Sequence, residues 1–177
     1  CRAEIEKLSG DLFPCPGGGE KRIGGIVPHA GWYFSGKVIC NVIGCLRNET
    51  SPDTFVIFGR HLHPGSSNYI MKEGFWSTPL GEIRIDHEFA DKLIKEFHFK
   101  IETATDNEPD NTIEVLLPFI KYFFPDVSIL PVGLPPANAS VIIGERIAEI
   151  SIEMSRDILI LGSTDLTHYG YNYGFTP

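Results

Sequence analysis

The sequence is short of cationic side chains and of paired cysteines, and each shortage argues against a class of protein. Lys and Arg number 15 against 23 Asp and Glu, the net charge is −8, and no Lys/Arg cluster offsets it. A nucleic-acid partner is therefore not expected. The 4 cysteines form no Cys-x-x-Cys pair. We interpret them as reduced thiols and expect no disulfide.

Several other signals are missing as well. No apolar run approaches the length of a membrane span, and the first residues do not resemble a signal peptide. A cytoplasmic protein without a membrane partner is the expectation. No Gly-x-Ser-x-Gly turn follows a strand, which argues against a serine hydrolase. Gly17-Gly18-Gly19 lacks the Lys-Ser/Thr of a phosphate-binding loop.

The chain does contain short apolar runs that alternate with helical patterns. Four runs predict strands that lie side by side in one sheet, the first, second and last of them parallel: residues 22–27, 54–59, 127–133 and 157–162. Residues 68–85 predict a small antiparallel hairpin at the sheet edge. Helices are expected within 1–10, from a cap at Ser35 or Gly36 to Leu46, from Asp86 to Phe97, from Thr112 to Phe124, and over 138–154. The pattern predicts one three-layer α/β/α domain over residues 1–177 with a mainly parallel sheet.

Three of these strands deliver a histidine just beyond their carboxyl ends. His29 follows the first strand, His61 the second, and His168 the last, with Asp165 close to it. Right-handed crossovers bring the carboxyl ends of parallel strands to one edge of the sheet, where ligands bind in open α/β folds. We therefore expect these four side chains to converge in one crevice.

Two imidazoles and a carboxylate form the set that holds Fe(II) with open positions, and zinc accepts the same donors. His29, His61 and Asp165 could supply that set, with His168 as an acid/base beside it. His63 competes with His61, and in an extended segment only one of the two faces the site. The alternative for each histidine is that it caps a strand end or binds a backbone carbonyl.

The segment Ile26-Val27-Pro28-His29-Ala30-Gly31-Trp32, followed by Ser35-Gly36, resembles the signature of the Memo family. This family includes the AmmeMemoRadiSam system protein B of bacteria and archaea. Further segments match in the family's order between about residues 21 and 173: Phe58-Gly59-Arg60-His61, Ser77-Thr78-Pro79-Leu80-Gly81 with Arg84-Ile85-Asp86, Thr112-Ile113-Glu114 with Leu117-Pro118, and Ser163-Thr164-Asp165 with His168-Tyr169-Gly170.

The resemblance implies a fold like that of class III extradiol ring-cleaving dioxygenases, which bind non-haem iron. It also implies a metal-dependent oxidoreductase acting on a small molecule, with iron first and copper or zinc as alternatives. His29 and His61 match the family's histidine metal ligands. Asp165 and His168 match the polar residues beside the metal and are the candidate catalytic residues.

The chain departs from the family pattern in three places. Leu62 occupies the usual offset of the second histidine, so a one-residue gap aligns His61, with His63 as the fallback. Asn111 stands where many members have a histidine. The family's N-terminal Trp-Tyr segment and its portion after the Asp-x-x-His segment, which carries the third metal ligand, are not in this sequence.

From these departures we expect a version shortened at both ends, or a fragment, with a metal pocket that is weakly occupied or lacks its ion. The alternative function is a non-catalytic binding or scaffold protein that retains the dioxygenase-like pocket without a complete metal site. A homo-oligomer or a protein partner is compatible with either function. The identity of the small-molecule substrate stays open.

Overall fold

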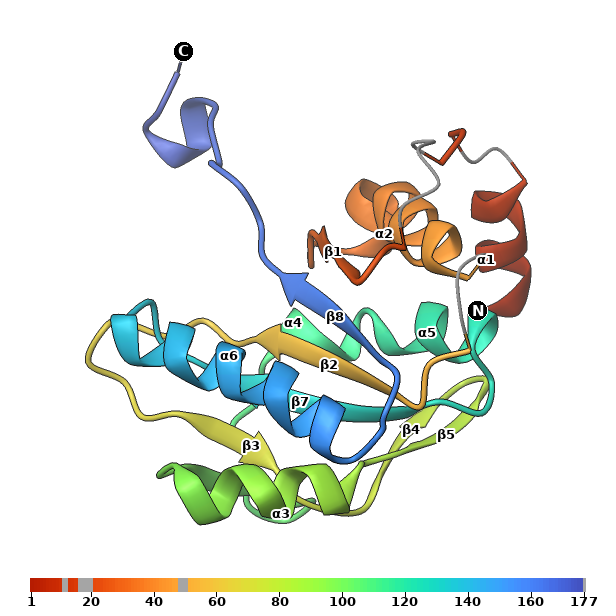
Figure 1. The fold of residues 1–177 in the computed structure, drawn as a ribbon. Helices are drawn as coiled ribbons and strands as arrows, with labels where there is room; N and C mark the ends of the chain where they lie inside the picture. Colours follow the sequence, from red (N-terminus) through yellow and green to blue (C-terminus); the bar gives the residue numbers. More distant parts are fainter. Residues whose placement is uncertain (11–12, 16–20, 48–50, 177) are drawn as a thin grey trace.

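The computed structural model describes residues 1–10, 13–15, 21–47 and 51–176. A six-stranded sheet lies at its centre (Figure 1). The strands are, in sheet order, β1 (Gly24–Val27), β8 (Ile158–Ser163), β2 (Thr54–Gly59), β7 (Ser128–Gly133), β3 (Tyr69–Met71) and β6 (Lys100–Glu102).

The four strands predicted from apolar runs are neighbours in this sheet. β1 pairs with β8, β8 with β2, and β2 with β7, all in parallel. β3 then runs antiparallel to β7, and β6 runs parallel to β3. The predicted mainly parallel sheet is therefore confirmed, and the carboxyl ends of β1, β8 and β2 lie next to one another.

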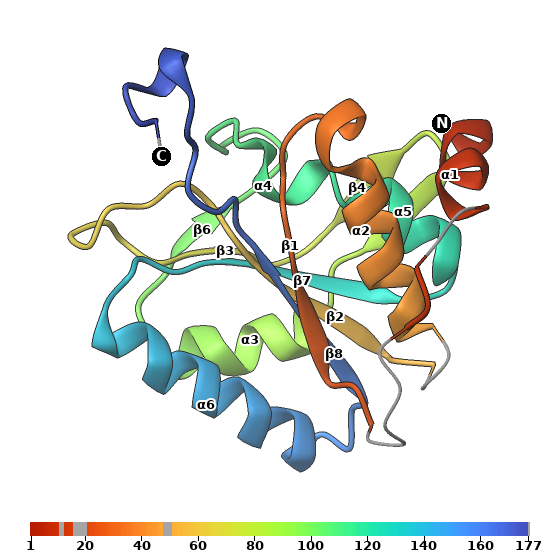
Figure 2. The same ribbon diagram turned by 90° about the horizontal axis from the view of Figure 1, so that it is seen from above.

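Helices cover both faces of the sheet (Figure 2). One face carries α1 (Arg2–Ser9), α2 (Trp32–Leu46) and α5 (Leu117–Phe123), and the other carries α3 (His87–Glu96) and α6 (Asn138–Glu153). Phe55 and Val56 are adjacent on β2, are both fully buried, and belong to different core clusters. Because successive strand residues point to opposite faces, a strand covered on both sides is apolar throughout.

The segment 68–85 forms the expected hairpin with one difference. β4 (Phe75–Thr78) and β5 (Gly81–Arg84) pair antiparallel as a separate two-stranded sheet. β3 leaves the hairpin and joins the main sheet. A bridge between Ile85 and Ile129 ties the end of the hairpin to β7.

Two helices differ from the expected bounds. α2 begins at Trp32 with Gly31 as its N-cap, so Ser35 lies in the first turn, where its Oγ donates to Ala30 O at 2.6 Å. The helix expected from Thr112 to Phe124 is divided into α4 (Asn111–Glu114) and α5. Pro118 lies in the first turn of α5, where its missing N–H has no helical partner to lose.

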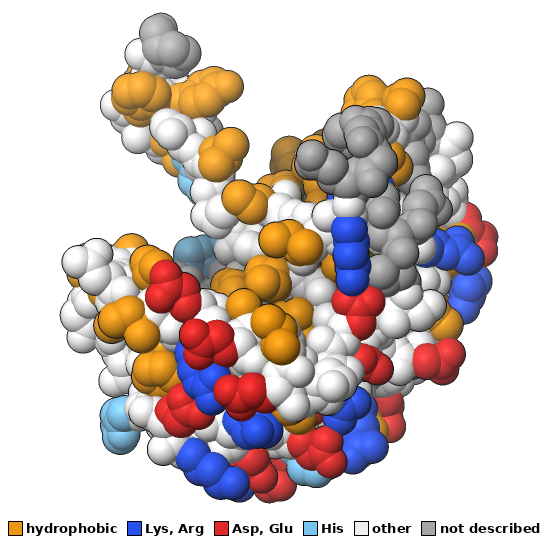
Figure 3. All heavy atoms as spheres, in the orientation of Figure 1, with side chains coloured by type: hydrophobic (Ala, Val, Ile, Leu, Met, Phe, Trp, Pro, Cys, Tyr) orange, Lys and Arg blue, Asp and Glu red, His pale blue; other side chains and the backbone are white. Residues whose placement is uncertain are grey.

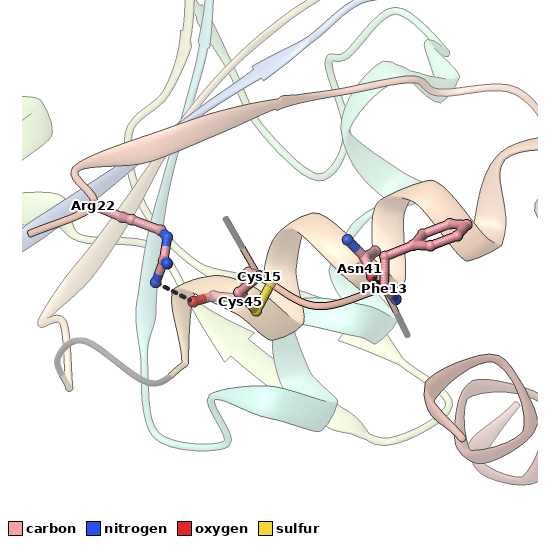
Figure 4. Close-up of a disulfide and its surroundings, with 5 residues drawn as sticks. All are labelled: Phe13, Cys15, Arg22, Asn41 and Cys45. Carbon is pink, nitrogen blue, oxygen red and sulfur yellow. Dashed lines mark hydrogen bonds between the residues drawn. A yellow bond between two sulfur atoms is a disulfide. The ribbon is translucent and has the colours of Figure 1, made fainter. Parts of the chain in front are cut away.

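The expectation of no disulfide is wrong, because Cys15 is bonded to Cys45 (Figure 4). Residues 13–15 lie against α2, and the Phe13 N–H donates to Asn41 Oδ1 at 2.7 Å. This contact brings the two Cα atoms to 5.5 Å, a normal distance for a disulfide. The pairing depends on how a loop crosses a helix, which cysteine spacing does not reveal.

No helix in the described part of the chain combines the length and the apolar character that a bilayer crossing requires.

Candidate functional site

The site lies where β1, β8 and β2 end side by side. His29 follows β1 after Pro28, and His61 follows β2 after Arg60. Their Nε2 atoms are 3.2 Å apart, and the two rings meet edge to face. The structure thus brings together two imidazoles that are 32 residues apart in the sequence.

His29 is the buried member of this pair, with a side chain that is 8% exposed. Its Nδ1 lies 3.1 Å from Ser163 Oγ, at the end of β8. The Ser163 hydroxyl donates its own proton to the carbonyl oxygen of Thr112. Ser163 Oγ must therefore accept from His29, which places the ring proton on Nδ1 and leaves Nε2 with a lone pair.

His61 is the exposed member, with a side chain that is 63% exposed. Its backbone N–H and its Nδ1 both lie against Asp110 Oδ2, at 3.1 and 3.2 Å. Burial raises the pKa of the Asp110 carboxyl, but hydrogen bonds from Thr112 and His61 outweigh burial and hold the pKa below its usual value. An ionised carboxylate only accepts, so the ring proton of His61 is also on Nδ1.

Both hydrogen-bond partners therefore leave an Nε2 lone pair, and the two lone pairs face each other across 3.2 Å. Two bare lone pairs at this distance repel, and a cation between them, either a proton or a metal ion, would remove the repulsion. Two nitrogens bound 2.0–2.1 Å from one metal ion, at angles from a right angle to tetrahedral, lie about 2.9–3.4 Å apart. The residues present therefore fit a shared metal ion.

Asp165 and His168 complete the edge of the site. Asp165 Oδ1 accepts the His29 backbone N–H at 2.9 Å, and Oδ2 lies 3.8 Å from His29 Nε2 and 3.3 Å from His168 Nε2. Burial raises the pKa of Asp165, but the His29 N–H and the two imidazoles outweigh burial and hold the pKa below its usual value. The carboxylate thus adds negative charge beside the facing nitrogens.

Of the two histidines that follow β2, His61 is the one that meets His29. His63 is exposed, and its backbone N–H bonds to Ser66 Oγ in the next turn. The chain reverses at Arg60, which has a left-handed φ of 79°. Within the described ranges, no group of three or more His, Cys, Asp and Glu side chains is arranged to hold a metal ion. The two imidazoles with Asp165 beside them are the centre of the site.

The sequence did not assign the partners that orient the histidines to that role: Ser163 and Thr112 stood only within the family segments, and Asp110 only within an acidic loop that could line the mouth of the crevice. Ser163 is the last residue of a buried strand, and Thr112 is the second residue of α4, whose N-cap is Asp110. The Thr112 hydroxyl accepts the Arg60 N–H at 2.6 Å and donates to Asp110. A capping aspartate before a helix was the one signal that could have identified this side of the site.

Two further contacts hold the strand ends together. Asn111 Nδ2 donates to the His29 carbonyl at 3.1 Å. α4 packs so closely on β2 that a Cβ at Gly59 would lie 2.6 Å from Thr112 Oγ1 and 2.9 Å from Ile113. The glycine before Arg60 therefore permits the approach that places Asp110 against His61.

Comparisons with known proteins give a consistent result. A family model described as "Memo-like protein" matches residues 2–177. A MEMO1 family protein from Thermococcus onnurineus is 38% identical over 98% of this chain, and those from Pyrococcus abyssi and Pyrococcus horikoshii are 36% and 35% identical over 91% and 99%. The chain spans 62%, 58% and 63% of the lengths of these relatives.

Proposed function

The chain belongs to the Memo-like protein family, and from this premise we propose that it is a metal-dependent, dioxygenase-like oxidoreductase acting on a small molecule. One observation carries the proposal. The Nε2 atoms of His29 and His61 face each other at 3.2 Å, while their Nδ1 atoms are committed to Ser163 and Asp110. Histidine ligands of metal ions are oriented in this way by outer hydrogen-bond acceptors.

His29 and His61 would hold the ion through Nε2, and Asp165 places a carboxylate oxygen 3.8 Å from His29 Nε2. Imidazole with carboxylate suits non-haem iron, which we place first, and copper or zinc accepts the same donors. When bound, such an ion supplies Lewis-acid chemistry and, for iron or copper, electron transfer. The lowered pKa values of Asp110 and Asp165 keep both carboxylates ionised at neutral pH, which favours a bound cation.

The other residues of the site would handle substrate and protons. His61 is largely exposed while His29 is buried, so a small molecule approaches from the His61 side. His168 is exposed and lies 3.3 Å from Asp165 Oδ2, where it can hold a proton on Nε2 and exchange it with substrate or water. Asp165 orients that ring and also accepts the His29 backbone N–H.

A second function rests on the same distance. A separation of 3.2 Å between two ring nitrogens also fits an N–H···N hydrogen bond, in which a proton supplies the cation. In that case the chain would be a non-catalytic binding or scaffold protein that retains the pocket without a working metal centre.

Metal content distinguishes the two functions. We would purify the protein without chelator, add Fe(II), Cu(II) or Zn(II) in turn, and measure bound metal after desalting. The metal proposal predicts about one ion per chain for the wild type and for His63→Ala, and near-zero occupancy for His29→Ala and His61→Ala, with all four proteins folded by circular dichroism. Equal occupancy in His61→Ala and His63→Ala, or no bound ion in the wild type, would contradict it.

A further inference from the structure

A hollow lies near the histidine pair and shares one residue with it, because Asp110 lines the hollow and also contacts His61. It is a cavity of about 330 Å³ between the β4–β5 hairpin and the loop that joins β6 to α4. This volume is within the range of small-molecule sites. Its apolar wall includes Met71, Phe75, Trp76 and Ile113.

The charge on the cavity wall is strongly unbalanced. Five carboxylates line it together with a single cation, Arg60; the carboxylates are those of Glu73, Glu102, Glu108, Asp110 and Glu114. The two terminal nitrogens of Arg60 are already paired, since Nη1 lies 2.6 Å from Glu102 and Nη2 lies 3.2 Å from Glu108, whereas the buried Nε has no hydrogen-bond partner among the described residues. The guanidinium also stacks on the Tyr69 ring at 4.3 Å. Both terminal nitrogens of the one cation among the described lining residues are therefore already paired with carboxylates.

Two of the carboxylates are left without a counter-charge. Glu73 and Glu114 are both exposed, and neither side-chain carboxylate has a hydrogen bond or an ion pair with any residue that the structure describes. They stand on different segments, the β3–β4 turn and α4. A cation in the cavity would have a carboxylate available from each of these two segments.

The aromatic part of the wall suits a cation as well. Phe75 is 62% exposed and Trp76 is half-buried, and both line the cavity. The Trp76 Nε1–H donates to the Met71 sulfur at 2.9 Å, so the indole N–H is used within the wall. Aromatic rings attract cations to their faces, most strongly where water is partly excluded.

We propose that this cavity binds a small organic cation, an ammonium group carried on an aromatic or apolar body. The carboxylates recognise the charge, and the Phe75, Trp76, Met71 and Ile113 wall receives the body. The inference goes beyond the proposed function and does not depend on a metal ion, because Glu73, Glu114 and Trp76 take no part in the histidine pair.

Three probes of similar shape test the charge preference: benzylammonium, benzyl alcohol and benzoate, each titrated into the full chain in the presence of a chelator and followed by NMR chemical shifts. We expect benzylammonium to saturate with a Kd in the millimolar range, at least tenfold tighter than benzoate, and to weaken as NaCl is added. Binding of benzoate that equals or exceeds that of benzylammonium, or no saturation by benzylammonium, would overturn the proposal.

Variants locate the site. Glu114→Gln and Glu73→Gln should each weaken benzylammonium binding about fivefold, as expected for the loss of about 1 kcal/mol at a partly exposed charge. Glu145→Gln, an exposed glutamate on α6 over the opposite face of the sheet, is the matched control and should bind like the wild type. An equal loss in Glu145→Gln, or none in Glu114→Gln and Glu73→Gln, would contradict the assignment. Because these glutamates are exposed, the variants do not depend on a core substitution that could prevent folding.

Discussion

At the scale of single residues, the site is defined less by its histidines than by the groups that hold them. Ser163 and Asp110 determine which ring nitrogen of His29 and of His61 carries the proton. Without these acceptors each ring could adopt the other tautomer. Its Nε2 would then carry a proton that points towards the Nε2 lone pair of the other histidine. The facing lone pairs are thus a property of four residues acting together.

This dependence predicts an effect of Ser163→Ala. The variant removes the acceptor of His29 Nδ1–H, so we expect zinc affinity to fall about 10- to 100-fold, as for other outer-shell partners of metal-ligating histidines. Ser151→Ala is the matched control, since Ser151 is also buried, and its hydroxyl donates to the Ala148 carbonyl on α6. Titration calorimetry with zinc should show unchanged affinity for the control. Equal affinities in Ser163→Ala and wild type would argue against the tautomer assignment.

The sequence was informative about some residues of this site and silent about others. The placement of His29 and His61 followed from strand ends, because the end of a parallel strand fixes where the next residues go. The residue pattern alone did not decide between His61 and His63, and His61 was preferred only through the family resemblance; the left-handed φ of Arg60, which helps to set the course of this segment, is an uncommon conformation for a residue other than glycine. Ser163 was not identified because its role exists only through contacts with His29 and Thr112.

At the scale of elements, prediction succeeded where burial alone decides the structure. β2, β7 and β8 are apolar runs covered on both faces, and each lies within one residue of its expected bounds. Asp86 caps α3 as expected, with its carboxylate accepting the Phe89 N–H. The start of α2 and the division between α4 and α5 depend on local hydrogen bonds of Gly31, Ser35 and Leu116, and hydrophobic periodicity does not report those.

A cluster of charged side chains links α3 and α6, the two helices that share one face of the sheet. Figure 3 shows acidic and basic side chains interspersed over this part of the surface. Arg146 on α6 contacts Glu96 on α3 at 2.7 Å and Glu153, about two turns further along α6, at 2.6 Å. Hydrogen bonds from Arg146 lower the pKa of both glutamates. The cluster therefore contributes stability only while these carboxyls are ionised.

The sign of the pH dependence follows from these lowered pKa values. The contribution is fully present above the ordinary glutamate value of 4.5 and is lost as the pH falls below it through the folded-state values. We predict that Arg146→Met lowers the urea midpoint at pH 7 and that its difference from the wild type shrinks as the pH falls below 4.5. A difference that stays constant or grows towards acid pH would contradict this.

At the scale of the whole molecule, two features join segments that are far apart in the sequence. The sheet places β1 beside β8, and the disulfide bonds Cys15 to Cys45. The bond between Cys15 and Cys45 closes a loop with a sequence separation of 30 and attaches the N-terminal segment to α2. The expectation of a cytoplasmic protein rested partly on reduced thiols, and the disulfide removes that support. The compartment therefore stays a prediction.

The disulfide should contribute measurably to stability. Replacing Cys15 and Cys45 together by alanine should lower the free energy of unfolding by about 2–4 kcal/mol, chiefly by releasing a constraint on the unfolded chain. Cys1→Ala, at an exposed free cysteine, is the control and should change little.

Burial raises the pKa of the Cys40 thiol to about 11, so alkylation of the native, unreduced wild type should modify Cys1 alone. Modification of Cys15 or Cys45 without reductant would show that the bond is absent.

The central claim is that His29 and His61 share one metal ion through their Nε2 atoms. Crystals of the protein soaked with zinc, measured at the zinc absorption edge, test it most directly. We predict one strong anomalous peak between the two rings, about 2.0–2.1 Å from each Nε2, with both Nδ1 atoms still bonded to Ser163 and Asp110. A peak at His63 or His168 instead, or no peak between His29 and His61 at full zinc saturation, would contradict the account.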